Sequence, residues 1–265
     1  MGSGSEMIVL FTDFGLEGPY VGQMKARIHR DAPGVPIIDL FSDAPVANPK
    51  AAAYLLAAYA TEFPAGTVFL SVVDPGVGSE RPGVAMDVDG RWYVGPGNGL
   101  FELVARRAVA VRKWSLTWDP DTVSASFHGR DVFAPAAARL ARGLPPEGEG
   151  RPPSWNSYPD WPDDLAEVIY IDHYGNALTG LREGFVNPSF VLKANNVYLT
   201  HARTFTDVPP GEAFWYINAN GLVEISVNKG SAADKLGIGL GTRISVGKAE
   251  VNVSSSGIDP GRHIP

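Results

Sequence analysis

The alternation of strand-like and helix-like segments over residues 7–142 constrains the fold of this chain more than any other feature. Apolar runs typical of buried strands occur at 7–11 and 67–73, and residues 35–40 between them predict a further strand. Helix-like patterns lie between them, at 20–30 and 48–63. Asn48 fits an N-cap and Pro49 the first helical position. Strands and helices that alternate in this way indicate an α/β domain over residues 7–143, with a central, mainly parallel sheet.

The rest of this half continues the pattern. Asp89-Gly90 is a typical hairpin turn, so we expect paired strands on either side of it. The further predicted elements are strands at 83–88 and 92–94 and helices at 100–107 and 132–142. The glycine-rich run at 95–99 lacks the lysine and hydroxyl of a phosphate loop, so we expect a turn that leads into a helix.

Residues 144–165 differ in composition from both flanks. They are rich in proline, which removes backbone donors and disfavours regular structure, so we expect a semi-rigid linker. Residues 166–265 then show short apolar runs separated by turn residues, which predicts an all-β barrel or sandwich domain. Its predicted strands are 168–171, 177–178, 190–192, 197–200, 214–217, 223–227 and 243–246, with one helical turn at 232–236.

Charge and composition exclude several function classes. The chain has 265 residues and a net charge of -7, which argues against binding to nucleic acid or to an anionic membrane surface. It has no cysteine, so disulfides, thiolate metal sites and cysteine nucleophiles are excluded. No apolar run reaches the length of a membrane span, and no signal peptide is evident, so we expect a cytoplasmic protein.

The run Val-Asp-Pro-Gly-Val-Gly at 73–78, followed by Arg81, is the clearest candidate for chemistry. Asp74 stands at the end of a predicted strand, where open α/β sheets bind their ligands. Proline and glycine then turn the chain so that Arg81 returns toward Asp74. A structural Asp–Arg clamp explains the spacing as well as a catalytic pair does.

Two further polar side chains follow predicted elements of the first half. Asp13 follows the first strand, and aspartates there often bind ribose hydroxyls, although capping of the next loop is the simpler explanation. His128 lies beside Gly129 just before a helix and can donate or accept a proton near neutral pH. Arg130 and Asp131 can simply pair with each other.

The second half offers amides, hydroxyls and an aromatic ring near two predicted turns. Asn side chains can recognise the edge of a heterocycle, but Asn next to Gly is equally typical of a plain turn. The five histidines are scattered without the spacing of metal ligands, so we expect no metal site.

In this order the motifs resemble those of the S-adenosyl-L-methionine (SAM) hydroxide adenosyltransferases, whose relatives include fluorinating and chlorinating enzymes. The motifs are Phe-Thr-Asp-Phe-Gly at 11–15, the 73–78 run with Arg81, Phe-His-Gly-Arg-Asp-x-Phe at 127–133, Tyr-Gly-Asn at 174–176, and Asn-Gly-Leu-Val-Glu-Ile at 220–225 with Ser-Ala-Ala at 231–233. The resemblance covers about residues 7–247. One departure is Ser42, where many relatives have histidine after the second strand.

The resemblance implies a homotrimer whose sites lie between the N-terminal domain of one subunit and the C-terminal domain of the next. It implies that Asp74, Arg81 and His128 position and activate water, and that Asp13 holds the ribose. The implied nucleoside contacts are Tyr174 and Asn176, with Asn220, Ser226, Ser231 and Ala233 on the adenine side.

The implied reaction is attack of water on the ribose C5′ of SAM, giving adenosine and L-methionine with no cofactor or metal. Two alternatives stay open on the sequence: a halide-using adenosyl transferase and a non-catalytic SAM or adenosine binder. Asp74 favours water over halide, because a carboxylate beside the nucleophile repels an anion. A binder has no need of Asp74, Arg81 and His128 together.

Overall fold

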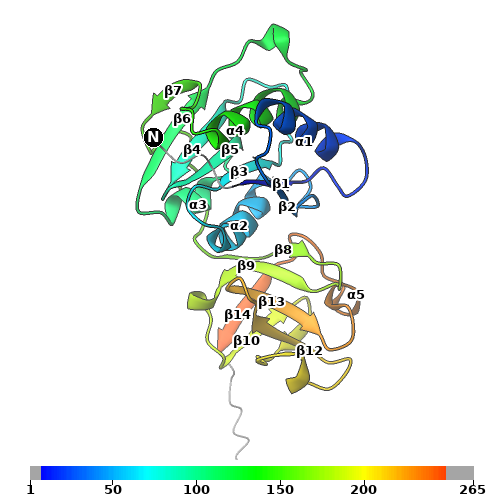
Figure 1. Cartoon of the computed structure of the whole chain (residues 1–265). Coiled ribbons are helices and arrows are strands. Elements are labelled where there is room, and N and C mark those ends of the chain that lie inside the picture. Colours follow the sequence, from blue (N-terminus) through cyan, green and yellow to red (C-terminus); the bar gives the residue numbers. More distant parts are fainter. Residues whose placement is uncertain (1–6, 249–265) are drawn as a thin grey trace, which may run out of the picture.

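The computed structural model describes residues 7–248, which form two domains stacked end to end (Figure 1). The N-terminal domain contains a seven-stranded sheet with helices on both faces, and the C-terminal domain contains two antiparallel sheets. The predicted α/β and all-β pair of domains is therefore confirmed. The part of the predicted C-terminal domain beyond residue 248 lies outside the described residues.

The seven-stranded sheet has the order β2-β1-β3-β5-β4-β6-β7. Its strands are β1 (Ile8–Thr12), β2 (Ile37–Phe41), β3 (Val68–Val72), β4 (Gly83–Val88), β5 (Arg91–Pro96), β6 (Val111–Leu116) and β7 (Gly148–Arg151). The pairs from β2 to β5 are parallel and the pairs from β5 to β7 are antiparallel, so the sheet is mixed. Asp89 and Gly90 both have positive φ, as the hairpin prediction requires.

Helices cover both faces of this sheet because successive residues of a strand point to opposite sides. Ile8 and Leu10 of β1 pack with α1 and α4, whereas Val9 and Phe11 pack with α2 and α3. The helices are α1 (Tyr20–Asp31), α2 (Pro49–Tyr59), α3 (Glu102–Arg106) and α4 (Ala134–Ala141), with 3-10 turns η1 (Ala60–Glu62) and η2 (Pro120–Thr122) and a π-helical turn η3 (Gly129–Phe133). The predicted cap is confirmed, since the Asn48 side chain accepts a hydrogen bond from Ala51 N at 3.0 Å.

The register of the parallel strands places the candidate carboxylates at one edge of the sheet. Thr12 of β1 lies opposite Val72 of β3. The residues that follow these strands, Asp13 and Asp74, therefore leave the sheet at the same end, which is the end where α/β folds bind ligands.

The predicted linker packs against the N-terminal domain. The expectation that it lacks regular structure is wrong at residues 148–151. Those residues form β7 because the free edge of β6 offers backbone hydrogen-bonding groups. Beyond β7, Arg106 donates to the Tyr158 carbonyl at 2.9 Å, and Glu102 accepts from Tyr158 N at 3.0 Å. Trp161 packs against Gly99, where a side chain would not fit.

The C-terminal domain packs a four-stranded sheet (β12-β13-β9-β8) and a three-stranded sheet (β11-β10-β14) around one core that contains Trp215. The strands are β8 (Leu165–Ile171), β9 (Ala177–Arg182), β10 (Phe190–Ala194), β11 (Val197–Leu199), β12 (Ala213–Ile217), β13 (Leu222–Val227) and β14 (Ile244–Lys248). Its helical elements are α5 (Ala232–Leu236), η4 (Glu183–Phe185) and η5 (Phe205–Asp207).

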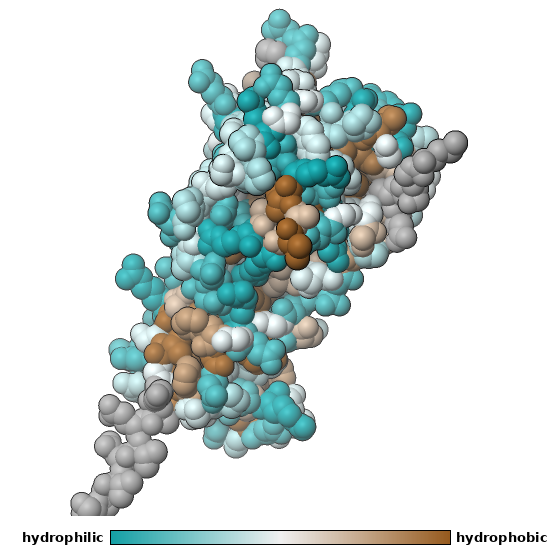
Figure 2. Space-filling view, turned by 90° about the vertical axis from the view of Figure 1, so that its left-hand side faces the viewer, coloured by the Kyte–Doolittle hydropathy of each residue, from teal (hydrophilic) through white to brown (hydrophobic). Residues whose placement is uncertain are grey.

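The two domains meet where α2 lies against β8 and β9 (Figure 1). Phe41 and Tyr170 pack edge to face at 5.3 Å, and the Tyr170 hydroxyl donates to Asp43 at 2.9 Å. Figure 2 shows a mostly hydrophilic face on which apolar side chains gather in small groups on both domains. Within residues 7–248, no helix has the length and apolar character needed to cross a membrane.

Candidate active site

Asp74 and Arg81 form a buried ion pair at the end of β3. The loop after Asp74 turns back so that Arg81 Nε donates to Asp74 Oδ1 at 2.8 Å and Arg81 Nη2 donates to Asp74 Oδ2. Their side chains are only 5% and 10% exposed, respectively. The turn needs glycine at Gly78, which has φ +82° and whose Cβ would lie 2.9 Å from the Ala125 carbonyl. The predicted return of Arg81 to Asp74 is confirmed.

His128 completes a group of three with this pair. It immediately precedes η3, and the residue is 5% exposed. Its Nδ1 lies 3.2 Å from Arg81 Nη2, and the ring of Trp118 packs against the imidazole at 5.7 Å. Burial lowers the pKa of His128 below its ordinary 6.5, and the positive charge of Arg81 lowers it further, against a weaker opposing effect of Asp74. The imidazole is therefore neutral at pH 7.

Asp13 lies at the same edge of the sheet. Its carboxylate accepts a hydrogen bond from Ala47 N at 2.9 Å. Burial raises the pKa of Asp13, the bond from Ala47 N opposes that shift, and the charge of Asp74 adds to it. The two carboxylates of Asp13 and Asp74 therefore interact electrostatically. This agrees with their predicted positions after two strands of the same sheet.

Arg130 and Asp131 pair with each other, as predicted from their adjacent positions in the sequence. Arg130 donates to both carboxylate oxygens of Asp131, which also accepts from Ser124 N at 3.0 Å. Asp131 thus anchors the segment that precedes His128.

A second group lines a cavity of about 710 Å³ that is formed mostly by the C-terminal domain, with Tyr59 of α2 contributed by the N-terminal domain. Its lining residues are Tyr59, Asp172, Tyr174, Asn176, Phe205, Tyr216, Asn218, Ala219, Asn220, Glu224, Val227, Lys229 and Gly230. Tyr174, Asn176 and Asn220 are the predicted nucleoside contacts that the structure brings together here. Asn176 donates its side-chain amide to Asp172 at 2.8 Å, so its carbonyl oxygen remains available to a ligand.

The other three adenine-side candidates lie outside the lining of this cavity. Ser226 is fully buried, with its hydroxyl 3.4 Å from Glu224 Oε1. Ser231 caps α5 by accepting from Asp234 N at 3.1 Å. Ala233 N donates to the Gly175 carbonyl at 2.9 Å, which fixes the loop that carries Tyr174 and Asn176. Their contacts in this structure support the cavity wall.

Several cavity residues were not singled out from the sequence. Glu224 is buried and accepts from the Tyr216 hydroxyl at 2.6 Å and from Asn218 Nδ2 at 3.0 Å, and burial raises its pKa. Glu224 stands inside the 220–225 motif and Asp172 lies two residues before the 174–176 motif, so their position was a usable signal. Phe205 reaches the cavity from η5, and nothing in its local sequence marks it.

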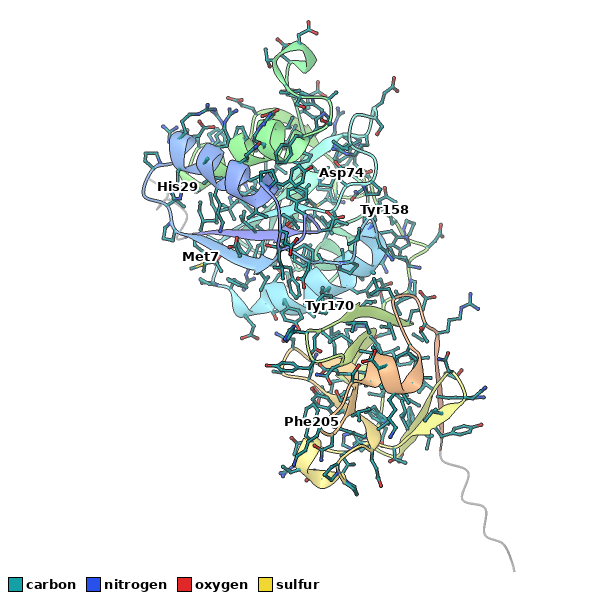
Figure 3. The ribbon with its side chains drawn as sticks, turned by 90° about the vertical axis from the view of Figure 1, so that its right-hand side faces the viewer. Met7, His29, Asp74, Tyr158, Tyr170 and Phe205 are labelled. Carbon is teal, nitrogen blue, oxygen red and sulfur yellow. The ribbon has the colours of Figure 1, made fainter. Side chains whose placement is uncertain are left out.

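The two groups are separate within one chain. Figure 3 shows Asp74 in the N-terminal domain, Phe205 in the C-terminal domain and Tyr170 at the junction between them. Within residues 7–248, no hydrogen bond or ion pair joins Asp13, Asp74, Arg81 or His128 to a residue of the cavity.

Comparison with known proteins assigns both domains to one family. Residues 8–150 match the SAM hydroxide adenosyltransferase N-terminal domain, and residues 166–245 match the C-terminal domain. An (R)-S-adenosyl-L-methionine hydrolase of Thermus thermophilus is 42% identical over 87% of this chain and 95% of its own length. The crystal structure of an uncharacterized conserved protein from Thermotoga maritima is 31% identical, with a TM-score of 0.81, covering 91% of this chain and 99% of its own. A fluorinase of Actinopolyspora mzabensis is more distant, at 24% identity over 86% of this chain and 92% of its own length.

Proposed function

The chain belongs to the SAM hydroxide adenosyltransferase family, and on that basis we propose that it hydrolyses S-adenosyl-L-methionine to adenosine and L-methionine. The relative from Thermus thermophilus is named an (R)-S-adenosyl-L-methionine hydrolase. The observation that carries the proposal is the buried set of Asp74, Arg81 and His128 at the ligand-binding edge of the sheet.

The chemistry suits these residues. The C5′ carbon of SAM carries a sulfonium, so methionine leaves as a neutral thioether and needs no general acid. Water forms the C5′–O bond as the C5′–S bond breaks, and the new oxygen then loses one proton. Asp74 accepts that proton, and the two hydrogen bonds from Arg81 hold its carboxylate in place. Burial keeps bulk water away and holds the nucleophile near the carbon. No cofactor or metal takes part in this scheme.

The substrate then spans both halves of the site. Asp13 binds the ribose hydroxyls, because a carboxylate at this edge is a suitable acceptor for a diol. Tyr174 and Asn176 contact the nucleoside, and the free carbonyl oxygen of Asn176 can accept from an exocyclic amine. Phe205 offers a ring face on which a purine can stack.

We propose further that the halves meet between subunits of a homotrimer. The separation of Asp74 from the cavity within one chain supports this arrangement. Leu16 and Val46, close in sequence to Asp13 and its partner Ala47, are 83% and 71% exposed. Large apolar side chains exposed beside a polar site are typical of a surface that a partner covers.

Hydrolysis is favoured over halide transfer. A carboxylate near the nucleophile repels an anion, and this repulsion grows as the local dielectric constant falls. Asp74 is 5% exposed, so solvent screens its carboxylate only weakly, and Arg81 offsets part of the charge that a halide at this point would meet.

Incubation of the purified protein with SAM tests the reaction directly. The buffer should be free of halide in one arm and contain chloride or fluoride in the others, with products followed by chromatography and mass. We expect several equivalents of adenosine in every arm and no halogenated nucleoside. Ligand that stays bound without turnover would support the binding-protein alternative.

Mixing two inactive variants tests the shared site. Asp74→Ala inactivates the part of the site on the N-terminal domain, and Asn176→Ala inactivates the part on the C-terminal domain. Subunits exchanged by dilution and reassembly would then form some sites with two intact halves. We expect partial recovery of turnover, whereas a site contained in one chain would recover none.

A further inference from the structure

A second cavity, of about 460 Å³, lies at the junction of the two domains, between α2, the end of β9 and the start of β13. Ala57 and Ala58 of α2 and Leu222 of β13 give this junction cavity an apolar lining, and Phe185 of η4, 48% exposed, adds an aromatic ring. Asn220 lines this cavity as well as the cavity of about 710 Å³, so the two lie next to each other. The volume of the junction cavity is within the range of small-molecule sites.

Two arginines line the junction cavity, and one of them is fully paired. Arg182 Nε donates to Asp164 Oδ1 at 2.9 Å, and Arg182 Nη2 donates to Asp164 Oδ2 at 2.7 Å. The backbone N of Arg182 donates to the same carboxylate at 3.0 Å. Arg182 and Asp164 therefore neutralise each other.

The other arginine, Arg107, has no carboxylate of its own. Among residues 7–248 its side chain makes one hydrogen bond, from Nη2 to the backbone carbonyl of Asp163 at 3.3 Å, and no ion pair. The Asp163 carboxylate accepts instead from Arg106 Nη1 at 3.0 Å, and Asp164 is already paired as described above. Because a guanidinium has five N–H donors, most of those of Arg107 are left for water or a ligand.

The surroundings of Arg107 disfavour an unpaired positive charge. Although the residue is accessible, the atoms around it remove part of its water, which lowers its pKa, and the positive charge of Arg182 lowers the pKa further. The nearby carboxylates of Asp163 and Asp164 oppose these effects only in part. An anion beside Arg107 would compensate the charge that the described residues leave open.

We propose that the junction cavity binds a small organic monoanion, whose carboxylate pairs with Arg107 and whose flat apolar body lies against Phe185 and the alanines of α2. The two oxygens of a carboxylate match the fork of a guanidinium. A monoanion is favoured over a dianion such as a phosphate monoester, because one guanidinium is open and Glu183 also lines the cavity. This binding site does not depend on the proposed hydrolysis.

Ligand-observed NMR titration of the full-length protein tests the class of ligand. The probes are benzoate and indole-3-acetate, which are aromatic carboxylates, together with phenyl phosphate and the cation benzamidine. We expect both carboxylates to saturate the protein in the millimolar range or below, phenyl phosphate to bind more weakly, and benzamidine not to bind. No saturation by either carboxylate would overturn the proposal, and tighter binding of phenyl phosphate would assign the cavity to phosphate monoesters instead.

Substitution of Arg107 tests the place of binding. We expect Arg107→Gln to weaken benzoate binding about tenfold or more, the usual effect of removing hydrogen bonds to a charged group, and Arg107→Lys to weaken it less. The matched control is Arg30→Gln on α1, which covers the opposite face of the sheet from α2; its side chain is 65% exposed, and the change should leave the affinity unaltered. Equal affinity of the native protein and Arg107→Gln would place the carboxylate elsewhere and overturn the proposal.

Substitution of Phe185 tests the contact with the apolar body. Phe185→Ala should weaken indole-3-acetate binding several-fold, because the ring face on which the ligand stacks is lost. Melting temperatures show whether each variant is folded, and we expect that of Arg107→Gln to stay near the native value because no ion pair is broken. Unchanged affinity in a folded Phe185→Ala would contradict the proposed position of the body.

Competition with adenosine separates the two neighbouring cavities. We expect benzoate to keep its affinity within a few-fold when adenosine saturates the cavity of about 710 Å³. Displacement of benzoate by adenosine would place the acid in that cavity and overturn the proposal. Failure of adenosine to bind, or of SAM to be hydrolysed, would count against the proposed function and would leave the benzoate titration of the Arg107 variants as it stands.

Discussion

Asp74→Asn distinguishes a catalytic pair from a structural clamp. The change keeps the size of the side chain but removes its charge, and it leaves the Arg81 guanidinium, 10% exposed, without a counter-ion. Breaking one partner of a buried ion pair typically costs about 3–5 kcal/mol. At about 2–4 °C of Tm for each kcal/mol in a chain of this size, Tm should fall by roughly 6–20 °C.

Turnover should respond separately from stability. Loss of the proton acceptor is expected to lower kcat by about 10²–10⁴-fold. Adenosine affinity should change much less, because Asp13 and the cavity residues, which are the proposed nucleoside contacts, are unaltered.

The double variant Asp74→Asn/Arg81→Met provides the decisive comparison. Removing both charges eliminates the unpaired guanidinium, so Tm should return most of the way to that of the native protein. Turnover should stay as low as in the single variant. Thermal melts and chromatographic assay of adenosine measure the two quantities on the same samples. Turnover that recovers together with Tm would show a structural clamp and refute the catalytic reasoning.

Three further predictions concern pH, the base-binding cavity and one loop. The kcat–pH profile should fall on the acid side with a midpoint below 6.5, because the lowered pKa of His128 keeps the ring neutral until then; a flat profile down to pH 5 would show that turnover does not depend on a neutral His128. Phe205→Ala should raise KM for SAM roughly tenfold or more with kcat nearly kept, since stacking on a base is worth about 1–3 kcal/mol, and an unchanged KM would place the base elsewhere. Gly175→Ala should lower Tm and adenosine affinity, because Gly175 has φ +82° and a Cβ would overlap Ser231; Gly184→Ala, which meets nothing within 4 Å, is the matched control and should change neither.

The fold was predictable from the sequence where local pattern and tertiary context agree. The buried strands β1 and β3 and the Asn48 cap follow from their apolar residues and from capping chemistry, and the structure contains them. The predicted strand between them is also present as β2, at the partly exposed edge of the sheet. β6 and β7 were missed. The sequence of β7, Gly-Glu-Gly-Arg, is fully exposed and has no apolar pattern, so only the neighbouring edge of β6 makes it a strand.

The candidate site was predictable to a similar extent. The ends of parallel strands bring Asp13 near Asp74, which the order of strands and helices already indicated. Side chains that reach a cavity from an irregular segment, such as Phe205, have no periodic signal. Ser231 lies in a motif because it caps α5, so a motif position alone does not distinguish a ligand contact from support of the backbone.

Hydrolysis of SAM in water enriched in oxygen-18 tests the central claim most directly. Attack of water at C5′ places the new oxygen on the ribose, so mass spectrometry should find one heavy oxygen in adenosine and none in methionine. Methionine formed without labelled adenosine, or a heavy oxygen in the amino-acid product, would contradict the proposed attack at C5′.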